Sequence, residues 1–262
     1  MTALDQAHAA MEAAPQSDEQ RLAFYAELAD AELFVLLRDE PSGREISPQV
    51  FDLEDGRFAL AFDAEERLAA FSDGPVPYAA LPGRVVAREL ARLSVGLGLN
   101  LGVAPSAFLL PPDALGWLSR TLETSPRSSA ARPVAFSAPD GVPDAVRHAL
   151  ARKLAPLGGI VPCAHLVAAR YVDGSNGHLL AFEGAKASTE AALAKAVAEA
   201  LVFSGTDAGA LDVVFLSEGD PALAAIGRAA LRLELSPPAA RAPARSAPAA
   251  PGMDPAKPPK LR

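Results

Sequence analysis

The 262-residue sequence contains one cysteine, Cys163, so no disulfide bond can form within the chain. Long apolar runs are also missing. The longest apolar stretch, residues 94–110, is interrupted by glycines, by Asn100 and by Pro105, and such a stretch cannot form a membrane-spanning helix. Residues 1–15 have no basic region and no continuous apolar segment, which is not typical of a secretory signal. We therefore expect a cytoplasmic protein without a membrane partner.

Basic residues are outnumbered by acidic residues except at the C-terminal end. The formal net charge is −8, yet residues 237–262 carry five basic side chains against one acidic side chain. The rest of the chain is therefore more acidic than the total suggests. Because an acidic surface repels phosphate backbones, we expect no nucleic-acid partner. The Pro/Ala-rich segment 237–262 contains too little apolar surface to offset its ordering entropy, which predicts a disordered tail.

Helical and strand patterns are mixed along the chain without a regular βαβ period, which favours an α+β fold. We predict two small mixed α/β sheet domains joined by a short linker. The boundaries are an N-terminal segment 1–17, a first domain 18–122, a linker 123–133 and a second domain 134–236. Helices are predicted from apolar periodicity over 18–29, 81–93, 144–154, 188–201 and 222–231, and from Pro112 onward. Strands are predicted over 32–38, 107–110, 134–136, 160–172, 178–183, 211–216 and 233–235.

Short motifs predict where individual elements begin. Ser17 stands three residues before Gln20, which is typical of a capping box at a helix start. The pair Asp55-Gly56 lies between two apolar runs and predicts a β-hairpin. Asp63, followed by Glu66, predicts a capped helix that carries its apolar side chains inward.

Acidic residues cluster in the predicted hairpin. Asp52, Glu54 and Asp55 are candidates for cation binding, but the sequence lacks the twelve-residue calcium-loop pattern. Strand alternation places Asp52 and Glu54 toward solvent, with Phe51 and Leu53 facing the core. The pattern therefore favours a solvated acidic face.

Residues 96–102, GLGLNLG, raise the question of a phosphate-binding loop. Such a loop follows a strand and opens a helix, whereas here a predicted helix precedes the glycines, and the spacing is GxGxxxG. The alternation of leucine with glycine predicts instead a strand with one bare face that another segment approaches closely. The loop that follows is a candidate interaction loop, formed by Gly98, Asn100, Gly102 and Pro105.

Cys163 and His165 are the candidate nucleophile and base. They share one face of a predicted strand, but no nucleophile motif flanks them, so a small buried residue is the competing interpretation of the cysteine. A metal site is not predicted, because strand alternation puts His178 on the face opposite His165. His8 and His148 lie in separate segments. We predict no cofactor and no catalytic residue.

Four segments together resemble the SseB family. The hairpin and helix at 50–71 and the glycine segment at 97–118 resemble its N-terminal domain, and residues 164–185 and 211–235 resemble its C-terminal domain. Leu101 stands where the family commonly has the proline of an Asn-Pro-Gly loop. The resemblance implies no enzymatic activity and carries over no catalytic residues.

The leading functional hypothesis is a non-catalytic cytoplasmic protein that binds another, unidentified protein, in a regulatory role. It rests on the lack of a coherent catalytic constellation and on strands that offer an edge for docking. One alternative is a transferase-type enzyme that depends on Cys163 and His165. A second alternative, which the family's serine-sensitivity phenotype implies, is a sensor that responds to an amino acid.

Overall fold

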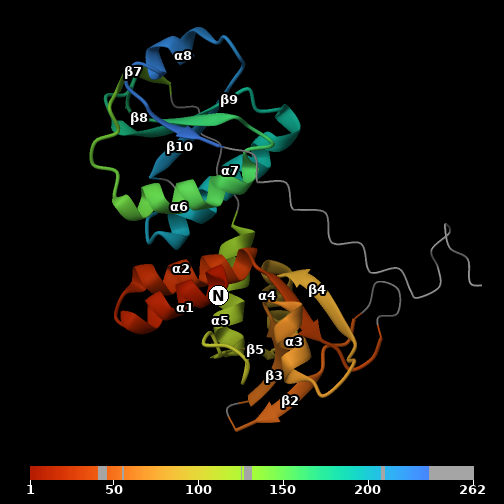
Figure 1. The fold of residues 1–262 in the computed structure, drawn as a ribbon. Helices are drawn as coiled ribbons and strands as arrows, with labels where there is room; N and C mark the ends of the chain where they lie inside the picture. Colours follow the sequence, from red (N-terminus) through yellow and green to blue (C-terminus); the bar gives the residue numbers. More distant parts are fainter. Residues whose placement is uncertain (41–45, 55, 125, 127–131, 208–209, 236–262) are drawn as a thin grey trace, which may run out of the picture.

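The computed structural model describes residues 1–40, 46–54, 56–124, 126, 132–207 and 210–235. In these residues helices and two mixed sheets form two domains, one above the other in Figure 1, which confirms the predicted α+β class with two sheet domains. Most of the predicted linker 123–133 and the whole predicted tail 237–262 lie outside the described residues. No helix in the described part of the chain is long and apolar enough to cross a membrane.

The first domain is built on a sheet of six described strands in the order β4-β1-β3-β5-β6, with β2 paired to β3. These strands are β1 (Glu32–Leu36), β2 (Val50–Leu53), β3 (Gly56–Phe62), β4 (Tyr78–Pro82), β5 (Gly96–Leu99) and β6 (Phe108–Leu110). The helices are α1 (Ala3–Ala13), α2 (Asp18–Asp30), α3 (Glu65–Phe71), α4 (Gly83–Arg92) and α5 (Pro112–Glu123). β3 and β5 are parallel, and the other pairs are antiparallel.

The two faces of the first sheet are covered by different helices. On one face, Leu33, Val35 and Leu97 belong to the main core with apolar side chains of α2, α4 and α5. On the other face, Phe62 packs with Leu68 of α3. Because successive strand residues point to opposite faces, a strand covered on both sides becomes a nearly continuous apolar run. This explains the pattern of residues 32–38.

The second domain is built on a sheet of five described strands in the order β10-β9-β8-β11, with β7 paired to the other half of β8. The strands are β7 (Pro133–Ser137), β8 (Cys163–Tyr171), β9 (Asn176–Glu183), β10 (Leu211–Leu216) and β11 (Leu231–Glu234). The helices are α6 (Asp144–Leu154), α7 (Ala187–Phe203) and α8 (Pro221–Ile226), with a short 3-10 turn at Ala155–Leu157. Helices α6 and α7 cover the sheet face that looks toward the first domain, and α8 lies on the opposite side (Figure 1).

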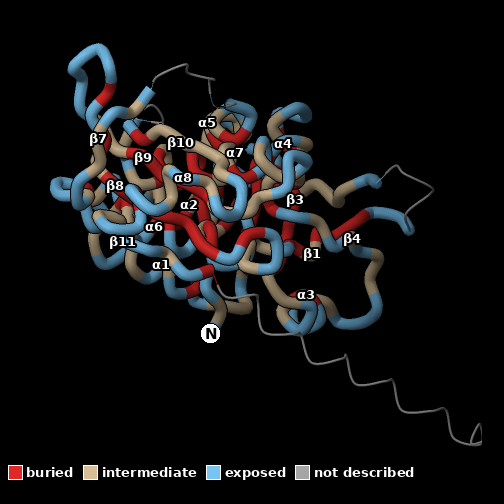
Figure 2. Tube along the Cα trace, turned by 90° about the horizontal axis from the view of Figure 1, so that it is seen from above, coloured by how far each residue is buried: buried red, intermediate tan, exposed pale blue. Residues whose placement is uncertain are grey.

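The domains meet through α2 and α7. Phe203, near the end of α7, is buried in the core of the first domain and meets Trp117 of α5 in an edge-on ring contact at 6.3 Å. Helix α2 packs against α1, α4 and α7, and the buried residues of α2 lie in its C-terminal half (Figure 2). This apolar contact makes the domain interface part of the first core rather than a loose surface contact.

Charged groups surround that contact. Glu199 of α7 is 4% exposed and pairs with Arg84 of α4 at 3.2 Å and with Lys153 of α6 at 2.7 Å. Lys153 and Arg84 also contact Asp30 of α2, at 2.7 Å and 2.6 Å. Removing a buried carboxylate from water is costly, so Glu199 depends on these two cations.

Several local predictions are confirmed. Ser17 caps α2, because the N–H of Gln20 donates to Ser17 Oγ at 3.3 Å, which is the first of the two bonds of the predicted capping box. The hairpin of β2 and β3 forms as predicted, although Asp55 itself lies outside the described residues. The helix at 144–154 and the strand at 211–216 begin and end at the predicted residues.

Other local predictions are wrong. Asp63 does not cap α3, because its side chain binds Arg67 and Thr2 instead. Leu53 does not face the core and is 42% exposed, since it lies at the free end of the hairpin. Residues 3–13, which we placed in a segment outside the first domain, form α1, and Leu4 enters its core.

Candidate functional site

The glycine stretch 96–102 is a strand followed by a turn. Strand β5 lies between β3 and β6 and is buried on both faces. A Cβ atom on Gly96 would lie 2.5 Å from the ring of Phe58, and a Cβ atom on Gly98 would lie 2.6 Å from the side chain of Leu60. The space beside Gly96 and Gly98 is therefore filled by side chains of the neighbouring strand β3. This explains the glycines by packing alone.

Asn100 ends β5 in a left-handed conformation, with φ of 49°. Its side chain is fully buried: Oδ1 accepts from the N–H of Asp63 at 3.1 Å, and Nδ2 donates to Ser106 Oγ at 2.9 Å. Asparagine tolerates this backbone region better than most residues, and here it also joins β3 to the loop before β6. Its role is therefore to hold the loop.

Asn100 belongs to a larger buried group, here called the Asn100 network, formed by Asp5, Asp63, Arg67, Asn100 and Ser106. Arg67 of α3 donates to Asp63 at 2.6 Å and to Asp5 of α1 at 3.0 Å. Ser106 donates to Asp5. The Arg67 guanidinium holds the pKa of Asp5 well below its usual range, although burial alone would raise it.

The Asn100 network is closed in the sense that, among the described residues, none of its buried side-chain nitrogen or oxygen atoms lacks a hydrogen-bond partner. Gly98 and Asn100 are buried, whereas Gly102 and Pro105 are exposed, so the four residues of the predicted interaction loop do not share one surface. The network ties α1, α3 and two loops together. Its geometry is that of a structural unit that stabilises the first domain.

The predicted pair Cys163 and His165 lies near the start of β8, and the structure adds a third residue. Cys163 is directly opposite Glu183, the last residue of β9, in the antiparallel register. The three side chains share one sheet face, because His165 is two residues from Cys163 along the strand. Gly184, with φ of 72°, then ends the strand. We call Cys163, His165 and Glu183 the Cys163 cluster.

The ligand-forming atoms of the Cys163 cluster converge. Cys163 Sγ lies 3.6 Å from His165 Nε2 and 3.6 Å from Glu183 Oε2, and the last two atoms are 3.2 Å apart. Cys163 and His165 are 2% and 7% exposed, whereas the Glu183 side chain is 31% exposed. The cluster is therefore a buried group that opens to solvent at its carboxylate.

Electrostatics disfavour a reactive thiolate in the protein alone. Burial raises the pKa of the Cys163 thiol, and the Glu183 carboxylate raises it further, while Arg232 on β11 opposes both effects. His165 Nδ1 is also buried and has no hydrogen-bond partner among the described residues. An imidazole that activates a nucleophile is normally oriented by such a partner. The pair thus lacks two features of a catalytic cysteine.

His178 lies opposite Ala168 in the sheet and thus on the face away from His165, as predicted. Glu183, in contrast, was missed as a possible ligand. Strand alternation already put Glu183 on the face of His165, but a turn at 173–177 with Val172 opposite His178 would pair Glu183 with Val167. The observed register instead pairs Glu183 with Cys163. Among the described residues, the Cys163 cluster is the group of histidine, cysteine and acidic side chains close enough to hold one metal ion.

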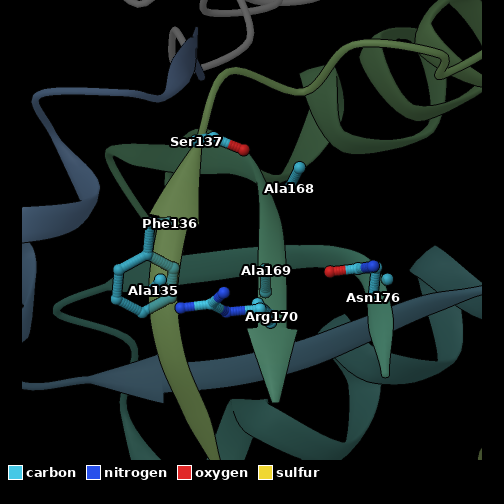
Figure 3. Close-up of a pocket in the computed structure, with 8 residues that line it drawn as sticks. Ala135, Phe136, Ser137, Ala168, Ala169, Arg170 and Asn176 are labelled. Carbon is cyan, nitrogen blue, oxygen red and sulfur yellow. The ribbon is translucent and has the colours of Figure 1, made fainter. Parts of the chain in front are cut away.

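A shallow depression of about 360 Å³ lies over β7, β8 and β9, in the second domain. Arg170 and Asn176 are its main polar side chains (Figure 3). Ala135 pairs with Arg170 in the sheet, next to a shift in the register of β7. The depression is partly open to solvent, and no acidic residue is among its lining residues. It offers few convergent groups to a small ligand.

The protein therefore has two α+β domains. The first contains the closed Asn100 network, and the second contains the Cys163 cluster. Residues 4–117 match the family model of the SseB protein N-terminal domain, which covers the first domain up to α5. No curated protein and no solved structure matches the chain. The likeness of residues 134–236 to the C-terminal domain of the same family stays a prediction.

Proposed function

We propose that this is a non-catalytic cytoplasmic protein of the SseB type that binds another protein through the free edge of its second sheet. The observation that carries the proposal is strand β10, which pairs with β9 on one side and has no strand on its other side among the described residues. Residues 212–216 of β10 are each partly exposed, and most of them are apolar. An apolar edge strand is a template for an added strand.

The backbone of β10 supports this mode of binding. The N–H of Gly184 donates to the carbonyl of Leu216 at 2.9 Å, so the backbone groups of Leu216 point toward β9. Because these groups alternate along a strand, the N–H groups of Val213 and Phe215 point away from the sheet. An extended segment of a partner would pair with them and place its side chains beside Phe215.

A co-purification experiment tests the proposal. The full chain is used as bait in a cell extract, next to Val213→Pro, which removes one outward N–H, and Val213→Thr, which retains it. We expect a stoichiometric partner with the wild type and with Val213→Thr, and its loss with Val213→Pro. The bait is also used without residues 237–262, and we expect the partner to remain. If all three full-length baits captured the partner equally, the partner would not bind at the β10 edge. If no bait captured a partner, the proposed protein-binding function would be wrong.

The competing candidate is an enzyme that uses Cys163 with His165, and the 3.6 Å contact between them favours it. The raised pKa of the thiol argues against it, because the thiolate is the nucleophile. Alkylation of the thiol across a range of pH separates the two candidates. A thiol that reacts as a thiolate at neutral pH would support the enzyme.

A further inference from the structure

We propose that the Cys163 cluster is a binding site for Zn²⁺, with Cys163, His165 and Glu183 as the three protein ligands. The proposal is independent of the docking edge at β10. A thiolate, an imidazole and a carboxylate are the three ligand types that proteins use for zinc. The thiolate and the imidazole also make the hard cations Mg²⁺ and Ca²⁺ poor occupants.

The distances between the three ligand atoms fit one tetrahedral ion. With usual bond lengths of about 2.3 Å to sulfur and about 2.0–2.1 Å to nitrogen and oxygen, tetrahedral zinc holds sulfur about 3.5–3.6 Å from the other two ligand atoms. The same geometry separates nitrogen from oxygen by about 3.3 Å. The corresponding distances here are 3.6, 3.6 and 3.2 Å. The triangle is already that of one face of a zinc tetrahedron.

The Cys163 thiol donates to Glu183, but hydrogen bonds within the cluster leave one polar atom of His165 without a favourable partner in either tautomer. If His165 Nε2 carries the proton and donates to Glu183, then Nδ1 is a buried acceptor without a partner. If Nδ1 carries the proton, the Nε2 lone pair faces the Glu183 carboxylate. A cation at the centre of the triangle gives all three atoms one common partner. Burying electron-pair donors that face one another is otherwise unfavourable.

Charge and access also suit a divalent ion. Binding breaks the S–H bond of Cys163, forms a bond from sulfur to zinc and releases the proton to solvent. The thiolate and the carboxylate then balance the two positive charges. Glu183 is the exposed member of the cluster, so the ion enters on its side, and water fills the fourth position.

Arg232 is a neighbouring cation that opposes the ion. It lies directly opposite His165 on β11 and contributes to the electrostatic environment of the thiol. Its side chain is 61% exposed, and its Nε lies 4.0 Å from Glu234 on the same strand. The arginine can therefore turn toward Glu234 when zinc binds. This requires no change in the sheet.

Cobalt spectroscopy tests the proposal on the full chain, after removal of any affinity tag and of bound metal. We expect one equivalent of Co²⁺ to produce the visible bands of a four-coordinate site together with a near-ultraviolet thiolate-to-cobalt band, and Zn²⁺ to remove both. Cys163→Ser should abolish the thiolate band. Competition with a chromophoric chelator should show zinc binding at least about 100-fold weaker in this variant, since even outer-shell changes cost about 10–100-fold.

Matched variants make the result specific. Glu183→Gln, at a partly exposed position, should weaken zinc binding without unfolding the chain, and His165→Gln should do the same. His178→Gln, on the opposite sheet face, should bind zinc as the wild type does. Circular dichroism confirms that each variant is folded. A six-coordinate spectrum without the thiolate band, no saturable binding, or unchanged zinc affinity in Cys163→Ser and Glu183→Gln would overturn the assignment.

Discussion

The two domains each contain a buried polar group, and the groups differ in whether their hydrogen bonds are complete. In the Asn100 network, the Arg67 guanidinium lies between two carboxylates, and Asn100 and Ser106 use their donors and acceptors on neighbours. In the Cys163 cluster, the Cys163 thiol donates to Glu183 but the buried His165 Nδ1 has no partner among the described residues, and no cation lies among the three ligand-forming atoms. The network contains its own cation and stabilises the fold. The cluster lacks one, which is why we assign it a ligand.

The largest expected effect is on the Asn100 network. Arg67→Met leaves the carboxylates of Asp5 and Asp63, each 3% exposed, without their cation. We expect the free energy of unfolding to fall by about 3–5 kcal/mol, as for other broken buried pairs. Denaturant titration measures the change.

The control for this variant is Arg21→Ala, which removes an exposed pair with Asp18. We expect a loss below about 1 kcal/mol for it. If Arg67→Met cost as little as the control, the network would not be a stabilising unit, and the contrast with the Cys163 cluster would disappear.

The next largest expected effect is the gain in stability when Zn²⁺ binds the Cys163 cluster, which the Asn100 network should not show. At a free Zn²⁺ concentration of about 100 times Kd, the wild type should gain about 2.7 kcal/mol of stability by mass action. Cys163→Ser should gain little. Thermal unfolding with and without zinc measures both. A similar gain in the two proteins would place the zinc elsewhere in the chain.

The Asn100 network should also make stability depend on pH. The pKa of Asp5 is lowered in the folded protein, so its ionised form stabilises the fold above the unfolded pKa of about 3.9. That contribution, about 1.5–3 kcal/mol for hydrogen bonds to a charged group, should be lost progressively as pH falls below this value. Comparing wild type with Asp5→Asn at pH 7 and pH 2 measures it, and a difference that grows in acid would contradict the sign.

The smallest expected effect is on the thiol of the Cys163 cluster. Glu183 raises the pKa of Cys163, so Glu183→Gln should move the pH profile of alkylation to lower pH, by less than about one unit because burial remains the main cause. Glu190→Gln, on α7, is the matched control and should leave the profile in place. A shift to higher pH would mean that the carboxylate does not contact the thiol.

Much of the fold was predictable from local patterns. The helix at 144–154, the strand at 211–216 and the β2–β3 hairpin were found because apolar periodicity and turn residues act over a few neighbouring positions. The interpretation of 96–102 as strand rather than phosphate loop rested on the preceding helix, which is α4. The most instructive error arose where a polar side chain had a distant partner. Asp63 was assigned to a helix cap because Thr2 and Arg67 were not visible as alternatives.

The sequence by itself determined most of the helices and strands, though not α1 or β4, and that Cys163 and His165 share a face. Only the tertiary structure decided what the polar side chains do, since Asp5 meets Ser106 across 101 positions and Glu183 meets His165 across 18 positions. Apolar periodicity shows which face of a single helix or strand is buried, and it depends only on residues close together in the sequence. A polar contact depends on the register and packing of several elements together, and that arrangement exists only after the chain has folded.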